Sequence, residues 1–105
     1  MEPRVGQVVT VFRSRLAEAH TEAYAEHAVR MSELARGMPG YVEHKIFVAS
    51  DGERVTLVTF ADRATHEAWR DHPEHRAAQR EGVRLYYDAY SISVGEVDYA
   101  SYFTR

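Results

Sequence analysis

The stretch "YVEHKIFVASDGERVTLVTF" (residues 41–60) decides the fold, because it contains two strand-like runs joined by a turn. Each run is rich in β-branched and aromatic residues, which favour strands. The dipeptide Asp51–Gly52 between them is among the strongest short-range signals for a hairpin. The sequence therefore predicts an antiparallel strand pair in the middle of the chain.

Helical segments flank this hairpin on both sides. From Thr21 or earlier to Arg36, apolar residues recur with the spacing of an amphipathic helix, and "GMPGY" (residues 37–41) ends it. After the hairpin, "DRATHEAWRD" (residues 62–71) has a helical pattern. Pro73 then restarts the helix at its first position, with Asp71 or His72 as the cap, and this second piece runs to about Gly82.

Two more strands complete the pattern, "GQVVTVF" (residues 6–12) and "YYDAYSISVGEV" (residues 86–97). The order strand, helix, strand, strand, helix, strand predicts an α+β fold of the ferredoxin-like, split βαβ type with a four-stranded antiparallel sheet. We expect one domain over residues 1–105, with its core in about residues 6–97. Helices cover only one face of such a sheet, so we expect a homodimer that packs sheet against sheet. The aromatic tail "DYASYFTR" (residues 98–105) is expected to dock on the partner subunit or on its own sheet edge.

Composition excludes several classes of protein. The net charge of −3 and the absence of a basic stripe give no support for nucleic-acid binding. The chain has no cysteine, which excludes disulfides, thiolate nucleophiles and cysteine-ligated metals. No segment approaches about 18 consecutive apolar residues, so no membrane partner is expected. We predict a cytoplasmic protein.

Two histidines are the candidates for chemistry. His27 falls near the centre of the apolar face of the first helix, where it is either a hydrogen-bonded core histidine or a general base kept neutral by desolvation. His75 shares one face of the later helix with Ala78 and Gln79, and this face approaches either the sheet or a ligand. The pair His72 and His75 spans a proline, and no ligand set for a metal ion is recognisable.

Other candidates follow from parity along the strands. Tyr86 and Tyr90 are expected on one side of the last strand and Tyr87 on the other. Arg13, at the end of the first strand, is either an exposed arginine or a residue that reaches into the site and stabilises an oxyanion. Trp69 is expected in the core or in the wall of a pocket.

The stretches "VVTVFRSRL", "ARGMPGYV", "AWRDHPEHRAAQREG" and "YYDAYSISVGEV" together resemble the antibiotic biosynthesis monooxygenase family, over nearly the whole chain from Val8 to Val97. The resemblance implies a dimeric α+β barrel and a cofactor-independent oxygenase for an aromatic, polyketide-like substrate. In such an enzyme the substrate is deprotonated and its anion reacts directly with O2. The expected base is His27 or His75, and the expected substrate-binding residues are Arg13, Tyr24, Trp69, Gln79 and Tyr90.

The chain departs from the family pattern at one important place. Quinone-forming members resemble "VTFAD" with an asparagine in the third strand and a tryptophan just after it, where this chain has Val58 or Thr59 and Asp62. Any such activity must therefore use other residues.

Two alternatives remain open within the same resemblance. Haem-binding or haem-degrading relatives carry a helix tryptophan that Trp69 matches and a histidine ligand ten residues later, where this chain has Gln79. They also carry a first-strand asparagine, which is missing near Phe12. If haem binds, His75 is the expected ligand. The other alternative is a non-oxidative cyclase, isomerase or decarboxylase, or a module that only binds a metabolite.

Overall fold

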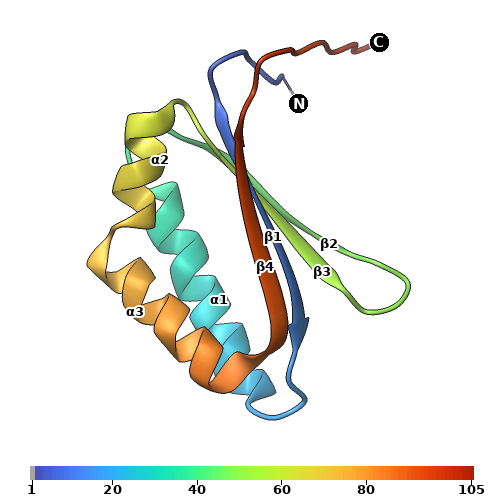
Figure 1. Cartoon of the computed structure of the whole chain (residues 1–105), viewed down its shortest axis with the longest axis vertical. Helices are drawn as coiled ribbons and strands as arrows, with labels where there is room; N and C mark the ends of the chain where they lie inside the picture. Colours follow the sequence, from blue (N-terminus) through green and yellow to red (C-terminus); the bar gives the residue numbers. More distant parts are fainter. Residues whose placement is uncertain (1) are drawn as a thin grey trace.

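The computed structural model describes residues 2–105 and confirms the predicted ferredoxin-like architecture. All four strands pair antiparallel in one sheet of order β2-β3-β1-β4, and the helices lie together on one face of it (Figure 1). The elements are β1 (Val8–Leu16), α1 (Thr21–Arg36), β2 (Tyr41–Val48), β3 (Arg54–Phe60), α2 (Arg63–Arg70), α3 (Pro73–Glu81), the π-helix η1 (Gly82–Tyr86) and β4 (Tyr87–Glu96).

The hairpin between β2 and β3 forms where the sequence predicts it. Its last register pair is Val48 with Arg54, and Gly52 occupies the turn with a φ of 91°, a left-handed conformation that glycine adopts without strain. The side chain of Asp51 accepts a hydrogen bond from the backbone N–H of Glu53 (3.0 Å). The turn chemistry read from the sequence therefore fixes the pairing of the two strands.

The predicted break at Pro73 divides the second helical segment into α2 and α3. Asp62 caps α2 by accepting from the N–H of Thr65 (2.8 Å), and the ring Nδ1 of His72 caps α3 by accepting from the N–H of Glu74 (3.1 Å). Of the two caps that the sequence offered for α3, the structure selects His72. The break turns α3 relative to α2, so that both helices line the same face of the sheet (Figure 1).

The hydrophobic core is small and lies at one end of the sheet. Phe60, Trp69 and Ala35 form its buried centre, with Met31, Leu34, Met38, Tyr41 and Val58 packed around them. Only Phe60 and Val8 are large side chains with no accessible surface among the described residues. The space between the helices and the rest of the sheet is therefore not filled by the core.

The C-terminal tail leaves the sheet after a last backbone contact between Val97 and Gln7. It runs away from the body of the molecule (Figure 1), and Tyr99 and Phe103 are 79% and 78% exposed. With these exposures the tail is not packed on its own sheet edge in this structure, one of the two expected positions. Docking on a partner subunit stays a prediction, as does the dimer. No helix in residues 2–105 is both long enough and apolar enough to cross a membrane.

Candidate functional site

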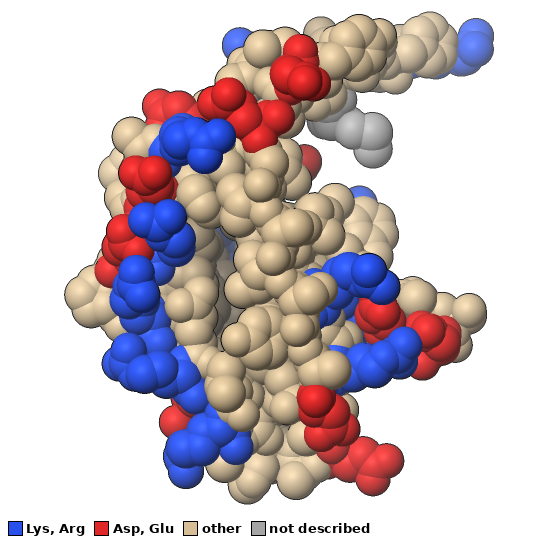
Figure 2. All heavy atoms as spheres, in the orientation of Figure 1, with Lys and Arg blue, Asp and Glu red and all other residues tan. Residues whose placement is uncertain are grey.

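A cavity of about 400 Å³ lies between the helices and the sheet. Figure 2 shows the hollow between the helical side of the molecule and strand β4. Its walls are mostly apolar, but polar rings and hydroxyls from several elements reach it. The polar and aromatic lining residues are Thr10, Phe12, Tyr24, His27, Ser32, His44, Thr56, His66, Trp69, Arg70, His75, Gln79, Tyr87 and Tyr90. An apolar chamber with a few convergent polar groups is the usual form of a small-molecule site.

His75 has the geometry of a general base. Its Nδ1 lies 3.0 Å from the carbonyl oxygen of Trp69, which can only accept, so Nδ1 carries the proton in that bond. In the neutral ring, Nε2 then holds a lone pair, and the residue lines the cavity. Burial lowers the pKa of His75 below its ordinary value of 6.5, against the opposing effect of the backbone hydrogen bond to Trp69. The neutral, proton-accepting ring is therefore favoured at neutral pH.

Trp69 holds the His75 ring in place. The two rings are stacked with their centroids 3.9 Å apart and an interplanar angle of 14°. On its other side Trp69 packs against Phe60 at 6.3 Å, so it belongs both to the core and to the cavity wall. The sequence left open which of these two positions it occupies, and the structure gives it both.

His27 lies in an aromatic cluster near the start of α1. Its ring meets the edge of Tyr86 at 5.0 Å and lies beside Tyr24 at 6.3 Å. It makes no side-chain hydrogen bond to any residue in the described part of the chain, which argues against the hydrogen-bonded core histidine. Burial lowers its pKa, and the charge of Glu81 opposes this effect. His27 thus lines the cavity, but without the fixed tautomer that His75 has.

The tyrosine parity expected from the sequence is wrong. Tyr87 and Tyr90 both line the cavity, whereas Tyr86 is buried against Tyr24 and His27. The cause is twofold: the π-helix η1 extends to Tyr86, so the strand begins one residue later, and the register with β1 shifts at Leu16, which pairs with Tyr87. Burial and the neighbouring Tyr24 raise the pKa of Tyr87 well above its usual range, so its phenol stays a hydrogen-bond donor.

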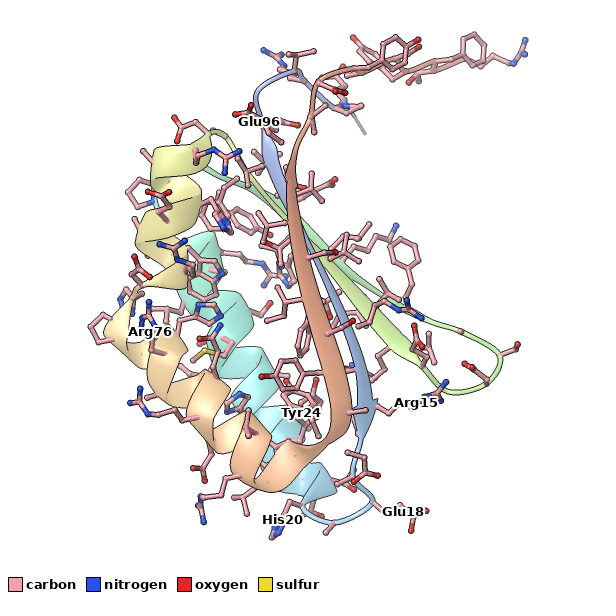
Figure 3. The ribbon with its side chains drawn as sticks, in the orientation of Figure 1. Arg15, Glu18, His20, Tyr24, Arg76 and Glu96 are labelled. Atoms are coloured by element: carbon pink, nitrogen blue, oxygen red, sulfur yellow. The ribbon has the colours of Figure 1, made fainter. Side chains whose placement is uncertain are left out.

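The structure does not place Arg13 in the cavity. Thr10 and Phe12 face the helices, and Arg13, with the opposite parity, lies on the other face of the sheet. There it binds Glu53 through two hydrogen bonds of 2.6 and 3.0 Å. Figure 3 shows Arg15, two residues on, beyond the sheet from Tyr24, which points into the space beside α1. The other expected residues, His27, His75, Tyr24, Trp69, Gln79 and Tyr90, all line the cavity.

Two further histidines, His44 and His66, which the sequence did not predict as site residues, also line the cavity. His44 on β2 hydrogen-bonds to Ser32 of α1 through Nε2 (2.6 Å) and to Tyr41 through Nδ1 (2.7 Å), so both of its nitrogens are occupied. His66 on α2 is only 6% exposed. The signal for His66 was present, because it precedes Trp69 by three residues and so shares its helix face. We call His27, His44, His66 and His75 the four cavity histidines.

The charges around the cavity are unusual in one respect. Its lining includes no Asp or Glu among residues 2–105, and its one cationic side chain, Arg70, is exposed and paired with Asp71. Within the same residues no three His, Asp or Glu side chains gather as a metal site would require. Apart from Arg70, the polar groups of the cavity are therefore imidazoles, hydroxyls and the Gln79 amide.

Comparison with known proteins gives a family match. Residues 7–81 match the family model "Antibiotic biosynthesis monooxygenase". The uncharacterized protein YqjZ of Bacillus subtilis (strain 168) is 31% identical over 96 residues, which is 91% of this chain and 83% of YqjZ.

Solved structures share the fold at low sequence identity. SnoaB from Streptomyces nogalater, a cofactor-independent oxygenase, superposes with a TM-score of 0.74 at 13% identity, over 90% of this chain and 96% of SnoaB. A dabb family protein with a ferredoxin-like fold from Mesorhizobium loti gives 0.69 at 17% identity, over 86% and 95% of the two chains. At these identities the likeness shows the fold alone.

Proposed function

Because the chain belongs to the antibiotic biosynthesis monooxygenase family, we propose that it is a cofactor-independent oxygenase for an aromatic small molecule, with His75 as the general base. The observation that carries the proposal is the His75 ring itself. It is stacked on Trp69, its Nδ1–H is bound by the Trp69 carbonyl, and its Nε2 lone pair is left for a ligand in an apolar cavity. A fixed tautomer and a lowered pKa are what a base needs near neutral pH.

The reaction requires no oxidant besides O2. A methylene group next to a phenolic ring system loses a proton to Nε2 of His75, and the resulting anion is electron-rich enough to reduce O2 directly. A C–O bond forms, and the peroxide anion takes the proton back from His75 to give a hydroperoxide. His75 then removes the second hydrogen of the same carbon as a proton, the O–O bond breaks to leave a carbonyl, and the departing hydroxide takes up that proton as water. The balance is CH2 + O2 giving C=O + H2O, so the substrate carbon supplies all four electrons.

The cavity suits such a substrate in size and character. At about 400 Å³ it lies in the lower part of the range of about 300–1,000 Å³ for small-molecule pockets. Aromatic rings from α1, α2 and β4 face it, and aromatic pairs add attraction beyond burial of area. Because the cavity carries no carboxylate in its described lining, an anion formed inside it meets no charge of the same sign.

Dithranol provides the test, because its methylene group is oxidised to a carbonyl with uptake of one O2. We expect wild-type protein to speed oxygen uptake above the rate in buffer and His75→Phe to abolish that increment. His27→Phe is expected to retain most of it, because His27 has no partner that fixes its tautomer. Arg13→Gln, on the far face of the sheet, is the matched control and should act like wild type. No increment above buffer would refute the oxygenase, and full activity in His75→Phe would refute the base.

Haem binding is the second candidate, favoured by one observation. The Nδ1–H of His75 is held by a backbone carbonyl, the arrangement that commonly orients a metal-binding histidine. His75 would hold the iron through Nε2, and bound haem would supply redox chemistry with O2. A hemin titration tests this alternative: a sharpened Soret band that saturates at one equivalent per chain, and is lost in His75→Phe, would establish it.

A further inference from the structure

His66 carries an unexplained polar atom. The residue is 6% exposed and lines the cavity, and its Nδ1 is the buried side-chain atom without a hydrogen-bond partner in residues 2–105. Its Nε2 also has no protein partner there but is not sealed off in the same way. A buried polar group that is left unpaired costs free energy, so such a group needs a reason. Because Nδ1 is sealed, only Nε2 is left to meet a ligand in the cavity that His66 lines.

The tautomer of His66 follows from which nitrogen is sealed. Burial, helped by the charge of Arg70, lowers the pKa of this ring, so it is neutral and has one N–H. In the protein backbone, unpaired buried N–H groups are rarer than unpaired acceptors, and we infer the same preference for this ring. The proton therefore belongs on Nε2, and the unpartnered Nδ1 keeps only a lone pair. His66 then presents a hydrogen-bond donor.

His75 presents the opposite polarity. Its Nδ1–H is used by the Trp69 carbonyl, so Nε2 can only accept. The two histidines lie on either side of Trp69 in the chain. His66 precedes Trp69 by one turn on α2, and the ring of His75 is stacked on the Trp69 ring. His44 cannot take either role without losing a bond to Ser32 or Tyr41. The cavity thus has one open donor and one open acceptor on imidazole rings beside Trp69.

We propose that His66 donates Nε2–H to a carbonyl oxygen of the ligand while His75 accepts a proton from it, so that the cavity selects aromatic ketones with an acidic proton. This inference rests on the proposed function for the identity of the base. Removing that proton places negative charge on the conjugated carbonyl oxygen, where a donor binds most strongly. His66 would therefore both recognise the substrate and stabilise its anion.

The experiment separates the carbonyl from the aromatic ring. Trp69 is the chain's single tryptophan and lines the cavity, so quenching of its fluorescence reports binding directly. Two probes of similar shape are titrated without O2: 1-acetonaphthone, which has a carbonyl, and 1-methylnaphthalene, which has none. Each is titrated into the wild type, into His66→Phe, which removes the donor, and into His66→Gln, which replaces it with an amide N–H.

We expect His66→Phe to weaken the binding of 1-acetonaphthone about tenfold, which corresponds to one hydrogen bond in a desolvated site. Binding of 1-methylnaphthalene should change less than about twofold in the same variant, which also shows that the variant is folded. His66→Gln should restore most of the lost affinity. If His66→Phe does not fold, the wild type must still prefer 1-acetonaphthone over 1-methylnaphthalene, and His66→Gln must keep that preference.

Equal effects on the two probes, or failure of the wild type to bind either, would overturn the inference. The experiments distinguish failure of this inference from failure of the proposed oxygenase activity. Loss of the carbonyl preference with intact dithranol oxidation would remove the role of His66 and leave the function. A clear carbonyl preference without oxygen uptake would keep the role of His66 and leave a non-oxidative enzyme or a binding protein.

Discussion

Gly82→Ala should reshape the cavity without removing a polar group from its lining. Gly82 follows α3 with ordinary helical angles (φ −59°, ψ −46°), so an alanine meets no backbone strain there. A Cβ at this position would lie 2.4 Å from Cε2 and 3.0 Å from Cδ2 of Tyr87. Carbon atoms pack at about 3.5–4.0 Å, so the ring must retreat by about 1.1–1.6 Å.

The Tyr87 ring has little room to retreat. It is packed against Phe12 at 5.3 Å, Tyr90 at 6.0 Å and Tyr24 at 6.1 Å between centroids. Overpacking of this kind costs about 1–3 kcal/mol, and the lower chain entropy of alanine recovers about 0.5–1 kcal/mol. We expect a net loss of about 1 kcal/mol in the free energy of unfolding, together with a smaller cavity.

Urea denaturation measures the first effect, and quenching of Trp69 by 1-methylnaphthalene measures the second. Gly37→Ala is the matched control, because Gly37 also caps a helix with negative φ and its Cβ would meet only backbone oxygens at 3.6 and 3.9 Å. That variant should be as stable as the wild type and bind the probe equally well. A Gly82→Ala protein that matches the wild type in both measurements would show that the position of the Tyr87 ring does not require a glycine at position 82.

Three further predictions concern charge and pH. The rate of dithranol oxidation should fall as pH drops through the pKa of His75, which lies below 6.5, and a pH-rate profile with no inflection below 6.5 would contradict this. The four cavity histidines all have lowered pKa values, so as pH falls below about 6.5 the unfolded chain binds more protons than the folded chain. The free energy of unfolding, measured by urea denaturation, should therefore drop between about pH 6.5 and 5. His66→Phe should lessen that drop, and an equal drop in this variant would contradict the contribution of His66. Replacing exposed Arg13 by Gln should leave probe affinity unchanged within error, and a loss of affinity would mean that the arginine reaches the cavity after all.

The fold could be predicted from the sequence because its decisive signals are local. The Asp51–Gly52 turn and the restart at Pro73 each depend on a few neighbouring residues, and both appear as expected. Tyr87 could not be placed by the same reasoning. Its side depends on a π-helix before the strand and on a register shift opposite Leu16, and both arise from how β4 meets β1 across the sheet.

The site residues could likewise be predicted only where a local pattern in the sequence marks them. His75 and Gln79 were found because helix periodicity places them on one face, and Trp69 was expected in the core or in a pocket wall; all three line one cavity. His66 was missed although its spacing to Trp69 carries the same signal. What marks it as special, a sealed nitrogen without a partner, is a property of packing that no spacing encodes.

The lack of a carboxylate in the described lining also shapes how His75 would act as a base. Once protonated, its ring has the Trp69 carbonyl, the nearby backbone of Arg70 and the face of the stacked indole as stabilising partners. Burial opposes the charge, so the imidazolium is a stronger acid than histidine in water. It would therefore return its proton readily, first to the peroxide anion and then to the hydroxide that leaves when the hydroperoxide collapses. An aspartate that accepted the Nδ1–H of the histidine would make the ring hold that proton more tightly, and the transfer of the proton back to the oxygen would be slower.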